Sequence, residues 1–470
     1  MKKYLKYRAG VVTFFSALII VGLLNAVAPK ATYSDRENRE LAKMPAFSWA
    51  SLADGSYLSG FQTYFSDTFL GRDWLFDFAS TIKSWYGLIG EEDEIIIETN
   101  PNNSVDEGIA QGGSSTPNAS EEAPSSQPSS SKEPSGSSQI TSSEAPSSQV
   151  SSEPPVSSMQ EPPREEDGQT VNGLVVGTQT VFQLYGYFEK VNNRYAAAVS
   201  NFADKYPNIT THCMVVPINT AFYLPEKYLS KTSDEKESIQ KIYAAMSDKV
   251  HTVDAYSKLE QHANEYIYFR TDHHWTQLGA YYGYSAFTES LGNTPFDLNE
   301  WRTVEYPNFL GSLYSKVREN AAAAKRLENN ADTLTAWIPA YEYKLLYYPD
   351  NSITKPASYH GKGTLVSETY KGSNKYMCFI HGDQPMEVIE NYDNSNGKTL
   401  MIFKESYGNA FVPLVCNDFE RVIVIDPRYF KCSLSELMTL YDVTDALFLN
   451  YILAPGTSQR VNEIEKIVNS

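Results

Sequence analysis

Beyond residue 168, short apolar runs alternate with longer amphipathic segments along the chain. The apolar runs have the length of buried strands and lie at 213–216, 266–269, 399–403, 421–425 and 446–449. The intervening segments predict helices at 181–206, 233–247, 276–291, 407–417 and 433–441. Strand-length apolar runs separated by helices are typical of a parallel sheet with helices on both faces. We therefore predict an α/β fold for residues 168–470.

Residues 108–167, which precede this pattern, are rich in Ser, Pro, Glu and Gln and have almost no large apolar side chain. Such a segment cannot bury enough apolar surface to offset the entropy that ordering would cost. We therefore expect residues 108–167 to be disordered. The segment divides the chain into two parts, and the patterns on either side of it indicate how those parts are related.

The part before this segment also carries the pattern of a folded region. Residues 33–100 hold aromatic and aliphatic side chains at helical spacing and end in a strand-like run, EIIIE, at 94–98. A second strand-like run, NGLVVG, follows the polar segment at 172–177. We expect these two runs to pair, which would make 33–100 the N-terminal part of one globular domain with 168–470. The alternative is that 108–167 is a stalk between the membrane and a domain that starts near residue 168.

The N-terminus predicts how the chain is placed relative to a membrane. Residues 1–10 hold four Lys or Arg side chains, and residues 11–28 are apolar and uncharged. This run is near the length of about 17–25 residues that a helix needs to cross a bilayer, and the basic flank favours a cytoplasmic start. We expect a cytoplasmic tip at 1–10, a transmembrane anchor at 11–28 and an extracytoplasmic main domain at the cell membrane. A signal peptide cleaved after Ala26-Val27-Ala28 is the alternative.

Charge and cysteine content narrow the choice of partners. A formal net charge of -18 argues against nucleic acid, because nucleic-acid binding requires a basic surface. The four cysteines are scattered, with no CxxC pair and no spacing typical of a metal site. Buried free thiols are therefore favoured, with one disulfide as the alternative in an extracytoplasmic domain.

Two polar stretches follow predicted strands, where α/β folds gather reactive side chains. The first, RTDHHW at 270–275, follows the run at 266–269, and the second, KES at 404–406, follows the run at 399–403. A serine at a strand-to-helix turn has an exposed hydroxyl. The backbone N–H groups of the following helix, beginning with Tyr407, could stabilise an oxyanion beside it.

A serine nucleophile needs a neutral histidine as its base and a carboxylate that orients the histidine. Asp272 and His274 are two positions apart, so their side chains project to the same side of an extended segment. We therefore interpret Asp272, His274 and Ser406 as a catalytic triad. Asp272, His273 and His274 also carry metal-ligand atoms, but there is no HExxH motif and no further spaced histidine pair. We expect neither a metal nor another cofactor.

Three other residues are candidates for substrate binding. His273 either faces the substrate or has a structural role. Trp275 either offers a platform for a sugar or packs in the core and anchors the helix that follows. Arg428 follows the run at 421–425 and either binds an anionic group or lies at the surface as a helix cap.

Four stretches of the sequence carry a family resemblance: TDHHWT (271–276), SDRENRELAKMPAFSW (34–49), FLGSLYSK (309–316) and KESYGNAF (404–411). Together they resemble the DHHW family of bacterial envelope proteins. That family is similar to the SGNH-hydrolase-like domains of alginate O-acetyltransferases.

The resemblance implies an SGNH-hydrolase-like (flavodoxin-like) fold in which Asp272 and His274 precede the serine Ser406. It also implies oxyanion donors from Gly-Asn elements, for which HGDQP (381–385) supplies Gly382 but has Asp383 where an amide donor would be wanted. A polysaccharide acceptor is implied as well, with a multipass membrane acyltransferase as partner and acyl donor.

We therefore expect a membrane-anchored, extracytoplasmic serine O-acyltransferase or esterase that transfers an acyl group, most simply acetyl, to or from an envelope or exported polysaccharide. The alternative is a non-catalytic protein that binds polysaccharide or assembles the envelope.

Overall fold

The computed structural model of the chain describes residues 163–348, 352–354 and 363–470, together with isolated residues and short stretches between 22 and 69. Most of the expected anchor at 11–28, the strand at 94–98 and most of the segment 108–167 lie outside the described residues. Within the described ranges, no helix is both long enough and apolar enough to cross a membrane.

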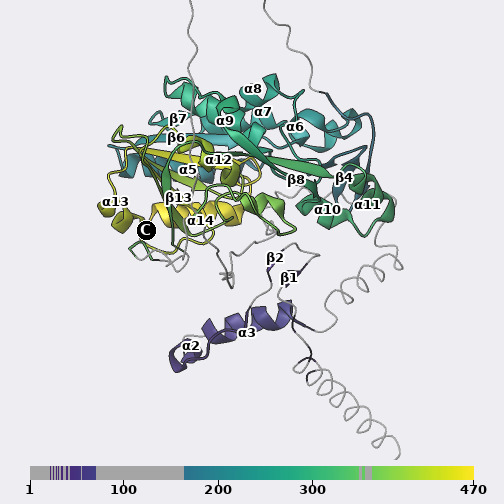
Figure 1. The fold of residues 1–470 in the computed structure, drawn as a ribbon, viewed down its shortest axis with the longest axis horizontal. Helices are drawn as coiled ribbons and strands as arrows, with labels where there is room; N and C mark the ends of the chain where they lie inside the picture. The colour runs from purple at the N-terminus through teal and green to yellow at the C-terminus, as the bar shows by residue number, and fades with distance from the viewer. Residues whose placement is uncertain are drawn as a thin grey trace, which may run out of the picture. The chain divides into compact units, whose positions relative to one another are not determined.

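A seven-stranded sheet forms the centre of residues 163–470 (Figure 1). Its strands, in spatial order, are β10 (Tyr343–Tyr347), β11 (Met386–Asn391), β13 (Arg421–Ile425), β12 (Thr399–Lys404), β14 (Asp445–Tyr451), β6 (Thr210–Val216) and β7 (Val250–Thr252). The strands from β13 to β7 are parallel to one another, whereas β11 is antiparallel to both β13 and β10. The α/β class is confirmed, but the sheet is mixed where we expected it to be parallel.

The short link between β11 and β12 explains the antiparallel strand. Only residues 392–398 connect the end of β11 to the start of β12. A crossover between parallel strands needs a dozen or more residues, usually including a helix. The chain therefore enters β12 in the opposite direction to β11, and β13 lies between them.

Helices cover both faces of the sheet. Successive side chains of a strand point to opposite faces, so neighbouring residues of one strand contact helices on different sides. On β6, the ring of His212 lies 5.3 Å from Phe287 of α9 (Gln277–Ser290). The next residue, Cys213, has its Sγ 3.5 Å from the hydroxyl of Tyr195 in α5 (Glu189–Lys205). Helix α14 (Ser458–Val468) packs on α5, and α8 (Ala255–Gln261) and α12 (Gly408–Val415) pack on α9. Figure 1 shows α8 and α9 above the sheet and α14 below it.

Several predicted elements occur close to where the pattern placed them. Helix α9 begins after Thr276, whose hydroxyl accepts the Gly279 N–H at 3.2 Å. The predicted helix at 181–206 instead starts with the short strand β5 (Val181–Phe182) and becomes helical only at Glu189. The run at 266–269 is not a strand of the sheet. It folds back on the following residues through a single bridge between Tyr268 and Trp275.

The predicted pairing of the run at 172–177 with the run at 94–98 is wrong. Strand β4 (Leu174–Gly177) is the middle strand of a three-stranded sheet, between β3 (Gly168–Val171) and β5. The turn from β3 to β4 is Asn172-Gly173, with φ of 52° and 79°, which matches the tight hairpin turn that Asn-Gly favours. Both edges of β4 are therefore occupied, which leaves none for residues 94–98.

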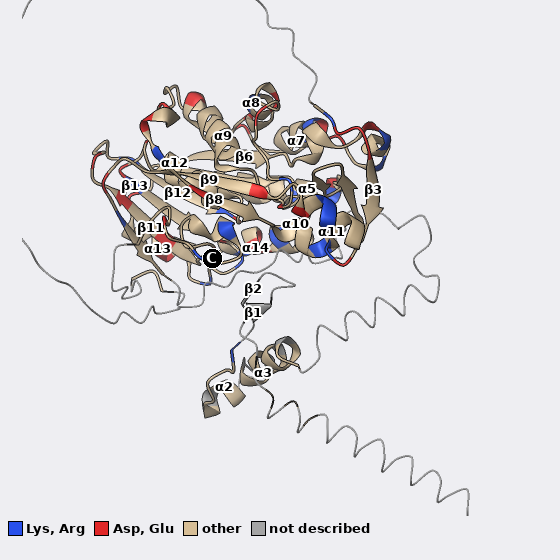
Figure 2. Cartoon of the chain, turned by 45° about the vertical axis from the view of Figure 1, so that its right-hand side comes forward, with Lys and Arg blue, Asp and Glu red and all other residues tan. Residues whose placement is uncertain are grey.

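The remaining elements lie around this frame. They are β8 (Arg302–Phe309) paired with β9 (Asp332–Ile338), the helices α6 (Thr220–Tyr223), α7 (Glu235–Ala244), α10 (Ser312–Val317), α11 (Ala321–Glu328) and α13 (Leu434–Leu440), the 3-10 helices η1 (Glu226–Lys231), η2 (Leu298–Glu300) and η3 (Lys375–Cys378), and, near the N-terminus, β1 (Tyr33–Ser34), β2 (Arg39–Glu40), α2 (Trp49–Ala53) and α3 (Ser56–Asp67). Basic side chains gather at α10 and α11 in the view of Figure 2, and acidic ones occur around the rest of the domain.

The cysteines agree with the favoured prediction. None of the four is part of a disulfide, and Cys213, Cys378 and Cys416 are buried in apolar surroundings. Burial raises the pKa of the Cys213 thiol to about 12. These thiols therefore stay protonated at ordinary pH and belong to the core.

Candidate active site

The loop that carries Asp272 and His274 is held in place by one buried carboxylate. Asp332, the first residue of β9, accepts the N–H groups of Arg270 and Thr271, both at 2.9 Å, and the Thr271 hydroxyl at 2.5 Å. The hydroxyl of Tyr266 also donates to Asp332. Burial raises the pKa of Asp332, and these hydrogen bonds oppose that rise. No local pattern in the sequence indicates this role, because Asp332 lies 60 positions beyond Asp272 in the chain.

Asp272 is bonded on both of its carboxylate oxygens. Oδ1 lies 2.5 Å from the Nδ1 of His274 and accepts the His274 backbone N–H at 3.1 Å. Oδ2 accepts the N–H of Ser312 at 2.7 Å. Burial raises the pKa of Asp272, but the neighbouring His274 and His273 together with these hydrogen bonds outweigh it and hold the pKa well below its usual range. The carboxylate is therefore charged and fixed in orientation.

Ser406 completes the arrangement from a distant part of the chain. It lies just beyond the carboxyl end of β12, a central strand of the sheet, and just before α12. Its Oγ is 2.7 Å from the Nε2 of His274, although the two residues are 132 positions apart in the chain. The three residues are 3–8% exposed. An unbroken hydrogen-bond path thus runs from Ser406 through the imidazole to Asp272.

The two candidate oxyanion donors differ in how their N–H groups are used. The first turn of α12 uses the N–H groups of Gly408 and Asn409, which donate to the carbonyls of Glu405 and Ser406 at 3.0 Å. Among the described residues, no acceptor takes the Tyr407 N–H. Gly382 has φ of 79°, and its N–H donates to the Phe379 carbonyl at 2.8 Å, so it is engaged in its own turn. The geometry favours Tyr407 over Gly382.

Trp275 lies in the core. Its indole N–H donates to the Tyr407 carbonyl at 2.9 Å, and the side chain is fully buried. A Cβ built on Gly283 of α9 would come within 2.7 Å of the indole ring, so this glycine leaves room for it. The structure therefore places Trp275 as the anchor of α9, away from any position where a sugar could stack on it.

His273 and Arg428, the other two substrate-binding candidates, are placed differently. His273 lies beside the triad, with its Nδ1 2.6 Å from the Ser312 hydroxyl and its side chain 11% exposed. The Arg428 side chain is buried, and its guanidinium is paired with Asp426 at 2.7 Å and with Asp383 at 2.8 Å. The structure brings His273 to the site and gives Arg428 a buried ion-pair role that neither sequence interpretation contained.

A buried cluster of polar and charged side chains includes residues on both sides of Ser406 in the chain. We call it the charge cluster; its members are Asp383, Lys404, Asn409, Asp426 and Arg428. Lys404 donates to the Asn409 side chain at 2.6 Å and to Asp383 at 3.3 Å. Burial raises the pKa of Asp383, but Arg428 and Lys404 outweigh it and hold the pKa below its usual range. Asp383 therefore acts as an anion that joins two cations, which explains its presence where an amide was expected.

Two further neighbours of the triad escaped the sequence interpretation. The ring of Tyr376, in η3, is stacked on the His274 imidazole, with centroids 3.8 Å apart and planes 9° apart. Gly311 precedes Ser312, and a Cβ built on it would come within 2.7 Å of the Asp272 Cγ. Gly311 lies in the stretch 309–316, which carries part of the family resemblance, whereas no motif in the sequence points to Tyr376.

The group Asp272, His273 and His274 also has the spacing of metal ligands. One ligand atom from each lies within 4.8 Å of the others. Both ring nitrogens of His274 are already hydrogen-bonded, to Asp272 and to Ser406. Binding of a metal through His274 would break one of these bonds, so the arrangement favours proton transfer.

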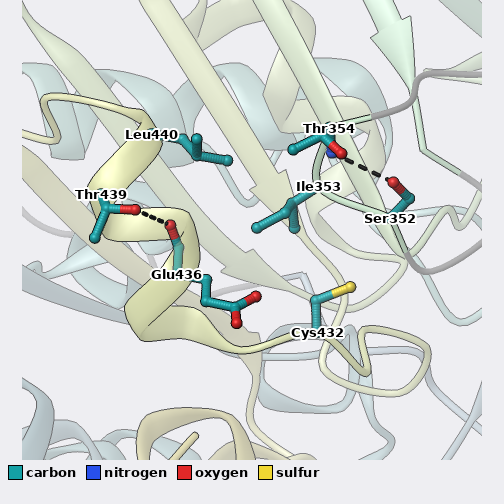
Figure 3. A pocket seen from close by; sticks show the side chains of 7 residues that line it. All are labelled: Ser352, Ile353, Thr354, Cys432, Glu436, Thr439 and Leu440. Carbon is teal, nitrogen blue, oxygen red and sulfur yellow. Dashed lines mark hydrogen bonds between the residues drawn. The ribbon is translucent and has the colours of Figure 1, made fainter.

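A separate pocket of about 430 Å³ lies between α13 and residues 352–354 (Figure 3). Its lining is Ser352, Ile353, Thr354, Cys432, Glu436, Thr439 and Leu440. None of these residues belongs to the triad, so the pocket is distinct from the candidate active site.

Comparisons with known proteins show the family to which the chain belongs. The sequence matches the family model described as DHHW protein over residues 37–425. The crystal structure of a DHHW family protein from Eubacterium siraeum is 33% identical, with a TM-score of 0.59, and the match covers 65% of this chain and 98% of that one. No match was found among curated proteins.

Two other solved structures are less similar. Bacillus cereus PatB1 with a sulfonyl adduct is 15% identical, with a TM-score of 0.49, and the match covers 63% of this chain and 99% of that one. The O-acetyltransferase domain of Pseudomonas putida AlgJ is 10% identical, with a TM-score of 0.32 and coverage of 59% and 91%. Likeness at this level supports no argument about activity. The family match spans most of the sequence and includes the Asp272–His274 motif, and on that basis the chain belongs to the DHHW family.

Proposed function

We propose that this chain is a serine O-acyltransferase or esterase with Ser406 as its nucleophile. The observation that carries the proposal is the hydrogen-bond path from the Ser406 Oγ through His274 to Asp272, with distances of 2.7 Å and 2.5 Å. Serine acylation needs this combination of a hydroxyl, a base and an orienting carboxylate.

The reaction would proceed in two halves. The Ser406 Oγ attacks the acyl carbonyl carbon while its proton passes to the Nε2 of His274, and Asp272 stabilises the imidazolium that forms. The Tyr407 N–H is the candidate donor to the oxyanion. The intermediate collapses, His274 returns the proton to the leaving oxygen, and an acyl ester remains on Ser406. An acceptor hydroxyl, deprotonated by His274, then attacks this ester, and the Ser406 oxygen takes the proton back.

The substrate and the cellular setting are part of the same proposal. The family resemblance supports acetyl as the acyl group, an envelope or exported polysaccharide as the acceptor, and a multipass membrane acyltransferase as the donor partner. The apolar run at 11–28 supports a single-pass anchor in the cell membrane with an extracytoplasmic domain. The burial of Trp275 removes the aromatic platform that the sequence offered for sugar binding.

Acylation of Ser406 tests the proposal directly. The full chain in detergent is incubated with p-nitrophenyl acetate, and intact and peptide mass spectrometry locate the acetyl group. We expect a transient adduct on Ser406 and loss of ester turnover in Ser406→Ala. Ser285→Ala is the matched control, because Ser285 is also buried but lies in α9, where its hydroxyl donates to the Tyr281 carbonyl. Equal turnover by the wild type and Ser406→Ala would refute the proposal.

A further inference from the structure

The face of the His274 ring is covered by a side chain that has no part in the proton path. The Tyr376 ring is parallel to the imidazole within 9°, at a centroid distance of 3.8 Å. The hydroxyl of the same side chain donates to the Ser406 carbonyl at 3.0 Å and to the Tyr407 carbonyl at 3.3 Å. Tyr376 therefore contacts the base through its ring and the backbone of the nucleophile through its hydroxyl.

We propose that Tyr376 is a positioning residue for the candidate base, an inference that rests on the proposed function. Its ring fixes the plane of the His274 imidazole and its hydroxyl fixes the turn that carries Ser406. Tyr376 is 2% exposed and contacts His274 and the backbone carbonyls of Ser406 and Tyr407, so it acts through the triad without touching a substrate.

The two hydrogen bonds of the His274 ring leave one rotation of that ring unrestricted. The bonds to Asp272 and Ser406 lie at the two ring nitrogens, so they define an axis through the imidazole. Rotation about that axis changes the tilt of the ring while both bonds stay nearly intact. A flat aromatic ring in van der Waals contact with one face opposes this tilt. Rigid placement of this kind matters because small errors in the geometry of reacting groups reduce rates steeply.

The same ring also favours the charged form of the base. When His274 accepts the proton of Ser406 it becomes a cation, and the face of an aromatic ring attracts a cation. The other titratable groups around the imidazole are Asp272 and His273 on its own loop and Tyr407 at the start of α12. Burial raises the pKa of Tyr376 well above its usual value, so its hydroxyl remains a neutral donor throughout.

Substitutions at Tyr376 separate the ring from the hydroxyl. Tyr376→Phe keeps the stacked ring and loses the bonds to the carbonyls of Ser406 and Tyr407, whereas Tyr376→Leu loses both. Tyr341→Phe and Tyr341→Leu are matched controls, because Tyr341 is also buried and its hydroxyl donates to a backbone carbonyl of α12, that of Pro413, at 2.7 Å.

The first measurement is the rate at which phenylmethylsulfonyl fluoride modifies Ser406 in the full chain, as a function of pH. We expect Tyr376→Leu to slow the reaction roughly 3- to 30-fold, as expected for loss of a cation–π contact. Its acidic limb should also move towards lower pH, because the charged ring has lost a stabilising neighbour. Tyr376→Phe should be slower than the wild type with its acidic limb unmoved, and the Tyr341 variants should match the wild type. In ester turnover the loss should appear in kcat and leave KM unchanged.

The second measurement needs no reaction. The Nδ1 proton of His274, held by Asp272, is followed as a downfield proton NMR resonance and assigned by its absence in His274→Gln. We expect this resonance to broaden or vanish in Tyr376→Leu and to persist in Tyr376→Phe and both Tyr341 variants. An unchanged resonance and an unmoved acidic limb in a Tyr376→Leu protein that melts like the wild type would overturn the inference. If that variant does not fold, a Tyr376→Phe protein that reacts at the wild-type rate overturns it. If wild-type Ser406 fails to react while the resonance still depends on Tyr376, the proposed function fails and the positioning role stands.

Discussion

Gly311 lies so close to Asp272 that no larger residue fits without movement. Its φ of −89° is open to any residue, so the restriction comes from space alone, because an added Cβ would lie 2.7 Å from the Asp272 Cγ. The close approach is what lets the Ser312 N–H donate to Asp272 at 2.7 Å. A residue without a side chain is therefore a condition for a correctly oriented triad carboxylate.

We predict that Gly311→Ala lowers ester turnover roughly 100-fold, the loss expected when a catalytic group is displaced by about 1 Å. The added methyl group pushes Asp272 away from Ser312 and His274. Turnover and the sulfonylation rate of Ser406 would measure the effect.

Ser312→Ala is the matched control for this prediction. It removes the hydroxyl that meets His273 at 2.6 Å but keeps the backbone N–H that holds Asp272. We expect it to retain turnover within a few-fold of the wild type. A Gly311→Ala protein as active as Ser312→Ala would show that Asp272 tolerates the displacement.

At the scale of elements, the charge cluster joins the ends of three neighbouring strands. Asp383 precedes β11, Lys404 ends β12, and Asp426 and Arg428 follow β13. Taking these charges out of water is costly, and only their mutual contacts offset that cost. The charge cluster therefore holds together the ends of the strands next to Ser406.

We predict that Asp383→Ala destabilises the fold by about 3–5 kcal/mol, because it leaves Lys404 and Arg428 buried with too little negative charge. Glu368→Ala is the contrasting control. Glu368 pairs with Arg302 at the surface, where an ion pair contributes about 0–1 kcal/mol. Chemical denaturation of both variants would measure the difference, and equal losses would contradict the role given to the cluster.

At the scale of the whole molecule, one buried acid should make stability depend on pH. Glu235 is 4% exposed and accepts the Ile218 N–H at 2.8 Å, which ties α7 to the segment after β6. Burial raises its pKa from 4.5 to about 8. The folded protein therefore keeps this proton over a range of pH in which the unfolded chain has lost it. The stabilisation is present below about pH 4.5 and is lost as the pH rises through about 8.

We predict that Glu235→Gln is more stable than the wild type at pH 8 by at most about 4 kcal/mol, because the amide never has to ionise and can still accept the Ile218 N–H. The two proteins should converge near pH 5. Melting temperatures of the full chain between pH 5 and 8.5 would measure the difference. A constant difference across that range would show that Glu235 ionises normally in the folded state.

Local patterns of apolar and polar residues in the sequence predicted much of this fold. The runs at 399–403, 421–425 and 446–449 became strands of the sheet, since a short apolar run between helices has few other ways to be buried. The Asp-x-His spacing brought Asp272 and His274 to one side because alternate residues of an extended segment share a face. The structure brings Ser406 to the same point, and its catalytic role stays a prediction.

The sequence by itself determined most of the segments that are strands or helices and the short motifs that hold candidate reactive groups, because those properties depend on neighbours in the chain. Only the tertiary structure decided that β11 runs antiparallel, that Arg428 is buried in ion pairs, and that Tyr376 covers His274. These features depend on contacts between residues far apart in sequence. The physical reason is that periodicity is fixed by backbone geometry, whereas the partner of a buried charge or ring is fixed by the path of the whole chain.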